Sequence, residues 1–252
     1  MAAKLPISIA IITHNEERNL LACLESVRFA DDVVVVDSGS TDNTARIAED
    51  FSARFFVEEW KGFGPQKNSA VQKCKHQWVF ILDADERIPA ETQRELKAIM
   101  ARRDIADGYS FPRKNFFHGT WIRHSDWWPD RSVRLVNREK GCLGSATHER
   151  WISSGTIQEA QCPIEHHSYV DYADMLKRLN SYSTLIADEL YRSGKTTGPL
   201  TPVSRGVGMF LKVYLLKRGF LDGFNGLVIA LTKAGGSFFK YAKLRELRKN
   251  IK

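Results

Sequence analysis

The chain has 252 residues, of which 43% are hydrophobic and 11% aromatic, so it can bury a sizeable core and is not intrinsically disordered. No two of its four cysteines form a CxxC pair, which argues against a zinc site of the usual spacing and against a disulfide framework. The net charge of +7 is uneven, because residues 203–252 hold eleven Lys and Arg against two acids, which gives +9 there and −2 elsewhere.

The N-terminus does not resemble a secretory signal peptide, because its apolar run is short and no small-residue cleavage pattern follows it. No stretch reaches about 18 uncharged apolar residues, the length that a membrane-spanning helix needs. We therefore expect a cytoplasmic protein without a spanning helix.

The first part of the chain predicts a regular alternation of strands and helices. Apolar and β-branched runs predict strands at residues 7–12, 33–36, 54–57 and 78–82. Helices are expected over residues 16–27, from a cap at Ser40 to about Phe51, from Pro65, and from Pro89. Four strand–helix repeats indicate βαβ units, and therefore an α/β fold with a parallel sheet covered by helices.

From about residue 105 the pattern changes to short, aromatic-rich, strand-like pieces without a helix. Residues 171–193 again predict a helix, and so does the tail from Val203.

Polar residues follow three of the predicted strands, and in an open parallel sheet ligands bind at the carboxyl ends of the strands. Asp83 and Asp85 would point the same way in an extended chain, where each would raise the pKa of the other. Mg²⁺ or Mn²⁺ would relieve this repulsion, because these cations prefer carboxylate oxygens and substrate phosphates. Acids such as Asp85 and Glu86 are, alternatively, favourable just before a helix.

The ordered segments ISIAIITHNEERNL, VVVVDSGSTDNT, GPQKNSAVQ and WVFILDADERI, within residues 5–100, resemble the family 2 glycosyltransferases of GT-A fold. The later WWPDRSVRLVNREKG and THE resemble the branch that includes lipopolysaccharide core β-glucosyltransferases. The resemblance implies a mostly parallel twisted sheet flanked by helices, with a C-terminal helical extension. It implies a GT-A domain over residues 1–200, with a nucleotide-sugar-binding half (1–104) and an acceptor half (105–170), and a basic amphipathic tail (201–252).

The resemblance also implies a uridine-diphosphate (UDP) sugar donor. By position, Thr13, Asn15 and Glu16 match the first nucleotide contact, although Thr13 and Asn15 are equally suited to capping the following helix. Asp37 matches the carboxylate that accepts a hydrogen bond from uracil N3–H, or it is an ordinary turn acid.

Two further pairs complete the implied donor site. Lys67 and Asn68 stand where the family has an Arg-Asn pair near the base and the ribose, although Lys67 is by default a lysine on a helix surface. Asp83 matches the ribose and metal contact, and Asp85 the direct ligand of a divalent cation, Mg or Mn.

The catalytic base is expected in the His148-Glu149 pair. Inverting transfer needs a group that removes the proton of the acceptor hydroxyl. In the branch that the chain resembles, an HE pair occupies that position, so Glu149 is assigned as base, with His148 orienting it or reaching the metal or the diphosphate. The ordinary pKa of histidine, about 6.5, would favour His148 instead, and an exposed loop pair with Arg150 is the alternative without a catalytic role.

The acceptor is expected to meet polar and aromatic residues after residue 120. Trp128 could stack on a sugar ring, although for each tryptophan here, taken separately, a place in the core is the favoured interpretation. Asp130 could bond a hydroxyl, and Arg131 and Arg134 suit a phosphate or carboxylate. The His166-His167 pair has no evident partner in the pattern and is interpreted as structural.

The tail carries two apolar stripes at helical spacing, with most of its Lys and Arg off both of them. The stripes are Val203, Val207, Phe210, Leu211, Tyr214 and Leu215, and then Phe224, Leu227, Val228, Leu231, Phe238 and Ala242. Such helices can lie in the headgroup region of an anionic bilayer, or their apolar faces can pack on the catalytic domain. No nucleic-acid-binding motif is present, so nucleic acid is not an expected partner.

The leading hypothesis is a metal-dependent, inverting hexosyltransferase that moves glucose from a UDP-sugar to a lipid-linked lipopolysaccharide inner-core acceptor, at the inner face of the cytoplasmic membrane. One alternative is another envelope glycan or a peptide as acceptor. Another is a nucleotide-sugar-binding protein without turnover, which intact Asp83, Asp85 and Glu149 disfavour. The sequence predicts no oligomeric state.

Overall fold

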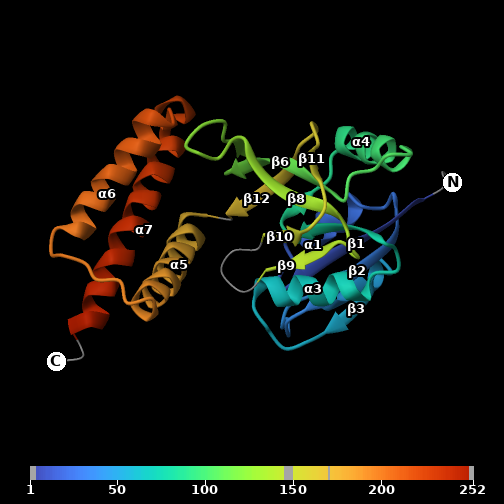
Figure 1. The fold of residues 1–252 in the computed structure, drawn as a ribbon, viewed down its shortest axis with the longest axis horizontal. Helices are drawn as coiled ribbons and strands as arrows, with labels where there is room; N and C mark the ends of the chain where they lie inside the picture. The colour runs from blue at the N-terminus through green and yellow to red at the C-terminus, as the bar shows by residue number, and fades with distance from the viewer. Residues whose placement is uncertain (1–3, 145–149, 170, 250–252) are drawn as a thin grey trace. The chain divides into compact units, whose positions relative to one another are not determined.

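The computed structural model describes residues 4–144, 150–169 and 171–249, and Figure 1 shows its fold. The chain forms two compact units, the first made of residues 1–113 and 130–166 and the second of residues 114–129 and 167–252. Within the described ranges, no helix is both long and apolar enough to cross a membrane.

Four parallel strands form the first half of the main sheet, in the order β3-β2-β1-β4. They are β1 (Leu5–Thr13), β2 (Ala30–Asp37), β3 (Arg54–Val57) and β4 (Trp78–Asp83). The register pairs Thr13 with Asp37 and Ile12 with Asp83. The three predicted strand ends therefore lie at one edge of the sheet, as the sequence predicted.

Helices cover both faces of this sheet, which explains why its strands are apolar on both sides. They are α1 (Leu20–Glu25), α2 (Thr44–Asp50), α3 (Phe63–Lys73) and α4 (Ala90–Met100). The buried side chains of α1, α2 and α4 pack with Ile7, Ile9 and Ile11, whereas those of α3 pack with Val34 and Val36. The predicted strand–helix alternation is confirmed.

The predicted start of α2 is wrong. Ser40 does not cap this helix, because its hydroxyl donates to Asp37 and accepts from the backbone N–H of Asn15. The helix begins at Thr44, whose backbone N–H donates to Asp42.

The aromatic-rich region extends the same sheet with strands that run largely antiparallel, so the complete sheet is mixed. The order continues β4-β8-β6-β12-β5, with β7 and β11 beside β6. Their bounds are β5 (Glu86–Arg87), β6 (Gly108–Phe117), β7 (Thr120–Trp121), β8 (Asp130–Asn137), β11 (Ile157–Glu159) and β12 (Ile164–Tyr169). A separate antiparallel pair is formed by β9 (Gly141–Leu143) and β10 (Trp151–Ser153).

The second unit is mainly helical and contains α5 (Tyr172–Arg192), α6 (Thr201–Leu211) and α7 (Gly223–Lys249). A π-helical turn (Lys212–Leu216) and a 3₁₀ turn (Gly219–Asp222) connect α6 to α7, which lie side by side in Figure 1. Both α5 and α6 pack on α7. The predicted helices are confirmed. The division predicted at residue 200 stays a prediction, and α5, which precedes that residue, packs on α7, which follows it.

Candidate functional site

The first strand end is organised around the buried carboxylate of Asp37. It accepts hydrogen bonds from the Thr13 hydroxyl (2.8 Å), the backbone N–H groups of Gly39 (2.9 Å) and Ser40 (2.7 Å), and the Ser40 hydroxyl (2.5 Å). Gly39 adopts a φ of +85°, which favours glycine. Asp37 thus fixes the loop that follows β2, while its predicted bond to uracil stays a prediction.

Asn15 joins the ends of β1 and β2. Its backbone N–H donates to the Ser40 hydroxyl (2.7 Å), and its side-chain oxygen accepts from the backbone N–H of Thr41 (2.8 Å). Its φ of 56° lies in the left-handed region that asparagine tolerates. The alternative in which Thr13 and Asn15 cap α1 is wrong, because Asn19 occupies the cap position.

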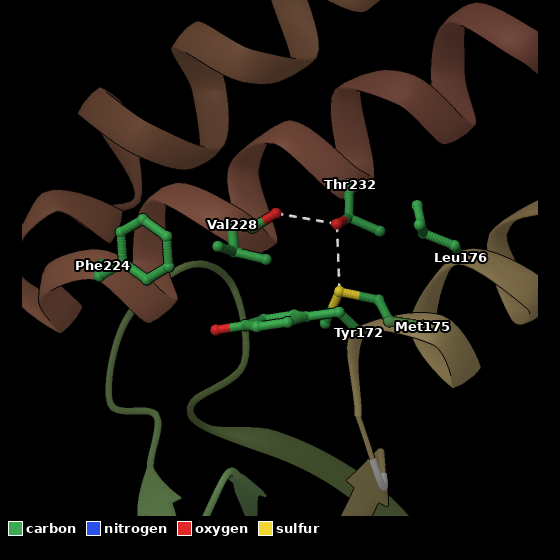
Figure 2. Close-up of a pocket in the computed structure, with 6 residues that line it drawn as sticks. All are labelled: Tyr172, Met175, Leu176, Phe224, Val228 and Thr232. Carbon is green, nitrogen blue, oxygen red and sulfur yellow. Dashed lines mark hydrogen bonds between the residues drawn. The ribbon is translucent and has the colours of Figure 1, made fainter.

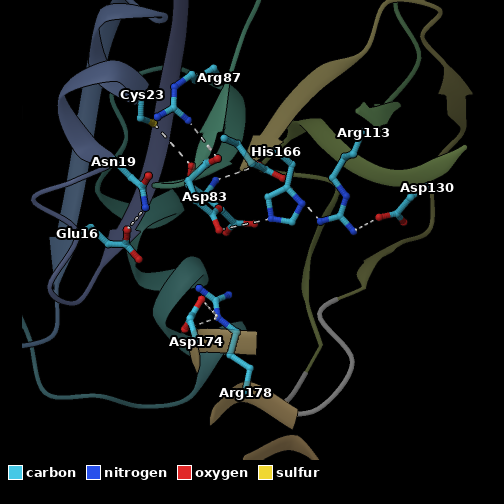
Figure 3. Close-up of polar contacts among 12 residues, drawn as sticks. Glu16, Asn19, Cys23, Asp83, Arg87, Arg113, Asp130, His166, Asp174 and Arg178 are labelled. Carbon is cyan, nitrogen blue, oxygen red and sulfur yellow. Dashed lines mark hydrogen bonds and ion pairs between the residues drawn. The ribbon is translucent and has the colours of Figure 1, made fainter. Parts of the chain in front are cut away.

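Glu16 also lies in this joined pair of loops. Its backbone N–H donates to the Thr44 hydroxyl (2.8 Å), and its carboxylate accepts from the Asn19 amide (2.9 Å), a pair visible in Figure 3. The sequence prediction that these polar residues gather at one edge is therefore confirmed for Thr13, Asn15, Glu16 and Asp37. Their contact with a nucleotide stays a prediction.

Asp83, at the end of β4, lies between two buried cations. Its carboxylate pairs with the Lys67 ammonium of α3 (2.6 Å) and with the Arg134 guanidinium of β8 (2.8 Å). Burial opposes the charge of Asp83, but Lys67 and Arg134 outweigh it and hold the pKa of this carboxyl well below its usual value. Lys67 is 5% exposed, so the default expectation of a helix-surface lysine is wrong.

Glu86 is a site residue that the sequence pattern did not reveal. Its fully buried carboxylate accepts from Arg134 (2.5 Å) and from the backbone N–H of Asp83 (3.1 Å), and Arg113 lies 3.6 Å away. Burial raises the pKa of Glu86, and the charge of Asp83 adds to this rise against the opposing effect of Arg134. Glu86 therefore fixes both Asp83 and Arg134.

Asp85 lies in the turn between β4 and β5, so the alternation of side chains along a strand does not extend from Asp83 to Asp85. Its carboxylate lies 3.5 Å from the imidazole Nε2 of His166, which is placed by the pairing of β12 with β5. Burial opposes protonation of His166, but the Asp85 hydrogen bond and the charges of Asp85 and Glu86 raise its pKa. The interpretation of His166 as a residue without a partner is wrong.

The donor set fits a divalent cation that is bound together with a phosphate-bearing substrate. Among the described residues, no three His, Cys, Asp or Glu side chains form a group that could hold a metal alone. Mg²⁺, however, is usually held by one or two carboxylates while substrate phosphates and water supply the other ligands. Because Asp83 is already paired with two cations, Asp85 is the better placed of the two carboxylates for this role.

Asn68 is engaged in positioning a strand. Its amide donates to the backbone oxygen of Leu143 (2.9 Å), and its side-chain oxygen accepts from the backbone N–H of the same residue (2.9 Å). These two bonds hold β9 against α3, and a ribose contact by Asn68 stays a prediction. The predicted catalytic pair, His148 and Glu149, lies outside the described residues.

The predicted acceptor residues have partners within the two units. Asp130 pairs with Arg113 (2.5 Å), Arg131 donates to the backbone oxygen of Ala160 (3.0 Å), and Arg134 belongs to the buried network. In the second unit, the Trp128 ring lies edge-on to the Trp121 ring, with 5.2 Å between centroids. Acceptor contacts of these residues stay predictions.

Comparisons with known proteins agree with this geometry. Residues 8–154 match the family described as glycosyl transferase family 2. The chain is 31% identical to the lipopolysaccharide core biosynthesis glycosyltransferase LpsC of Rhizobium meliloti, over 97% of this chain and 93% of the relative. It is 30% identical to an uncharacterized glycosyltransferase of Rickettsia typhi, over 96% of this chain and 87% of the relative.

A solved structure shares the fold. The crystal structure of S. aureus TarS 1–349 in complex with UDP superposes with a TM-score of 0.50 at 17% identity, and the match covers 98% of this chain and 92% of that one. At this identity the likeness shows the fold alone, and that fold is GT-A.

Proposed function

Because the chain belongs to glycosyl transferase family 2 and is a glycosyltransferase, we propose that it transfers glucose from UDP-glucose to a lipopolysaccharide inner-core acceptor. One observation carries the donor part of the proposal. The strand register sets Asp37, Thr13 and Asp83 side by side at the carboxyl edge of three parallel strands, where ligands of such sheets bind. The role of LpsC in core biosynthesis supports the acceptor part.

In the proposed donor complex, the loops after β1 and β2 contact the nucleoside and the β4–β5 turn contacts the diphosphate. The Asp37 network shapes the first contact, and Asp83, held by Lys67 and Arg134, faces the ribose. Asp85 would hold a divalent cation, Mg or Mn, which would supply positive charge to neutralise the departing diphosphate. The UDP complex of TarS supports a uridine nucleotide as donor group.

In the proposed transfer step, Glu149 takes the proton of the acceptor hydroxyl while that oxygen attacks the anomeric carbon. The new bond forms on the face opposite the diphosphate, whose bond to the sugar breaks, so the configuration inverts. His148 orients Glu149. This assignment rests on the match of the HE pair to the family pattern.

The acceptor would be lipid-linked, which places the reaction at the inner face of the cytoplasmic membrane with the anionic bilayer as a partner. The basic C-terminal region supports this location, because each Lys or Arg near an anionic surface contributes about 1 kcal/mol of attraction. Another envelope glycan or a peptide is the alternative acceptor.

A donor screen by thermal shift tests the proposal. We expect UDP-glucose to raise the unfolding temperature in the presence of Mn²⁺ and to raise it less when the metal is chelated. Asp85→Asn should remove the metal-dependent part, whereas Asp50→Asn, a change on the exposed surface of α2, should keep it. A shift of equal size with and without metal, or no shift with any uridine-diphosphate sugar, would contradict the proposal.

A further inference from the structure

A row of apolar side chains faces away from its own unit along α6, its N-cap residue Leu200 and the π-helical turn that follows it. We call it the α6 stripe; its members and exposed fractions are Leu200 (76%), Val203 (52%), Val207 (56%), Leu211 (45%) and Leu215 (52%). They recur every three or four residues and therefore share one helix face. Single exposed apolar residues are ordinary on protein surfaces, but a contiguous row indicates a surface that contacts something.

The packing of α6 fixes which face is outward. The opposite face buries Pro202, Gly206 and Val213. A Cβ at Gly206 would lie 3.3 Å from the Cβ of Phe238 and 3.4 Å from the backbone oxygen of Ala234, so the two helices approach closely there. The α6 stripe therefore cannot turn inward without separating α6 from α7.

The turn between α6 and α7 continues the apolar surface. We call it the hairpin tip; its members are Leu216 (78% exposed), Phe220 (47%), Leu221 (55%) and Phe224 (69%). Asp222, in the same turn, points inward and accepts from the backbone N–H groups of Arg123 and His124. The only acidic side chain of the turn is thus withdrawn from the hairpin tip.

An apolar groove adjoins Phe224 within the same unit, as Figure 2 shows. It has a volume of about 240 Å³, and the Thr232 hydroxyl in its wall is bonded to the backbone oxygen of Val228 (2.8 Å) and to the Met175 sulfur (3.1 Å). The other lining residues are Tyr172 and Leu176. The groove therefore suits an apolar group.

The charge around this surface is mainly positive, and one acid of the same unit, Asp126, pairs with Lys217 (2.9 Å). Residues 200–221 contain four basic residues and no acid, and all four are exposed: Arg205, Lys212, Lys217 and Arg218. Two C-terminal cations are hydrogen-bonded within the unit: Lys243 donates to the Asn180 side chain (2.8 Å), and Arg248 donates to the backbone oxygen of Tyr191 (3.0 Å). The exposed positive charge nearest the apolar surface thus belongs to α6 and the hairpin tip.

We propose that the α6 stripe and the hairpin tip form a binding surface for an anionic lipid bilayer. The inference refines the membrane partner of the proposed function. A basic helix with one apolar face lies in the plane of the headgroups, with its apolar side chains in the acyl boundary and its cations on anionic lipid. A second copy of the chain is disfavoured as occupant, because a symmetric contact would set Arg205, Lys212 and Arg218 against their own copies, while the acid Asp126 already pairs with Lys217.

Sedimentation with vesicles tests the proposal, using phosphatidylcholine alone and phosphatidylcholine with phosphatidylglycerol. The parent chain should bind the anionic vesicles and be released by salt. Leu211→Ser with Leu215→Ser should lower binding roughly tenfold, since two inserted side chains are lost. The matched control is Leu21→Ser with Val57→Ser, which changes side chains of similar exposure (54% and 66%) in the first unit and should bind as the parent does.

The charge is tested in the same way. Arg205→Gln with Lys212→Gln should weaken binding to anionic vesicles, whereas Lys97→Gln with Arg102→Gln, in the first unit, should not. Unchanged binding of both α6 variants, or equal parent binding to neutral and anionic vesicles, would overturn the proposal. So would a dimer in sedimentation equilibrium that is lost in Leu211→Ser with Leu215→Ser, because the occupant would then be a second copy.

A second readout separates this inference from the proposed function. Hydrolysis of soluble UDP-glucose with Mn²⁺ should be equal in the parent chain and in all four variants, which also shows that each variant is folded. Vesicle binding without any donor turnover would contradict the proposed function and leave the bilayer surface standing. Donor turnover without vesicle binding would contradict the bilayer surface and leave the proposed function standing.

Discussion

Two regions depart in opposite ways from the rule that apolar groups lie inside a protein and charged groups outside. One is the carboxyl edge of β1, β2 and β4 in the first unit, and the other is the hairpin formed by α6, α7 and the turn between them in the second. At the strand ends, charged groups are buried: Glu86 is 0% exposed and Arg134 is 3% exposed. On the hairpin, large apolar side chains are exposed, up to 78% for Leu216. A buried charge and an exposed apolar patch are the two informative exceptions to the rule that apolar groups lie inside.

The two exceptions have different physical consequences. Buried charges cost folding free energy unless each is paired, so the Asp83–Arg134–Glu86 network is sensitive to the loss of any member. Exposed apolar residues cost little in the isolated chain, and their benefit comes when something covers them. A change in the first region should therefore alter the stability of the fold or the transfer reaction. A change in the second region should alter the binding of a partner, except where it touches the packed face of the hairpin and so alters stability too.

The largest expected effect on stability comes from Arg134→Met. This change leaves the carboxylates of Asp83 and Glu86 without their shared cation, and breaking a buried pair costs about 3–5 kcal/mol. Urea unfolding measures it. Arg28→Met, which breaks an exposed pair with Glu25, should leave the midpoint unchanged. If both variants unfold at the same midpoint, the buried network does not stabilise the fold.

The chemical step should respond to Glu149→Gln. We expect transfer to fall at least about 100-fold while donor affinity is kept, because the amide cannot take the acceptor proton. Single-turnover transfer and calorimetric donor binding measure the two parts. Near-normal transfer by Glu149→Gln, together with an inactive His148→Ala that still binds donor, would make His148 the base.

Gly226→Ala should show where the second region does depend on packing. A Cβ at Gly226 would lie 1.8 Å from the backbone oxygen of Gly219, so the turn must shift and the unfolding temperature should fall. Gly208→Ala is the matched control, because its Cβ would meet nothing within 4 Å and alanine is the better helix former by about 1 kcal/mol. Equal unfolding temperatures for the two variants would contradict the close contact at Gly226.

The smallest expected effect concerns Glu58, a partly buried residue whose carboxylate forms ion pairs with Lys61 and Lys73. Hydrogen bonds from Lys73, Ser69 and Lys61 lower the pKa of Glu58 to about 2. Because the folded pKa lies below the ordinary 4.5, its stabilisation is present above pH 4.5 and is lost as the pH falls toward 2.

Glu58→Gln should therefore lower the unfolding midpoint at pH 6 and converge with the parent chain near pH 2. The control is Glu49→Gln, a change on the exposed face of α2. A constant difference between Glu58→Gln and the parent at every pH would show that the pairing does not depend on the Glu58 charge.

The sequence predicted the parts of this molecule that depend on local pattern. Val33 to Val36 predict a buried strand because both faces of a covered parallel sheet are apolar, and β2 contains them. The Asp83 strand end was likewise predictable, since a run of apolar residues ends there.

What the sequence did not predict depends on contacts between distant residues. Arg134 is 51 residues from Asp83 and 48 from Glu86, and His166 meets Asp85 only because β12 pairs with β5. The loop bonds that displace Ser40 from the start of α2 also come from a neighbouring strand end. In the tail, the apolar spacing predicted both stripes, but only the packing of α6 on α7 decides which of their residues stay exposed.

We propose that the carboxyl edge of β1, β2 and β4 binds a uridine nucleotide together with a divalent cation held by Asp85. Isothermal titration of UDP into the parent chain, Asp85→Ala and Asp37→Ala, each with and without Mn²⁺, measures this binding. We expect Asp85→Ala to lose the metal-dependent gain in affinity and Asp37→Ala to weaken binding even without metal. Equal metal dependence in the two variants, or UDP binding that neither change affects, would contradict it.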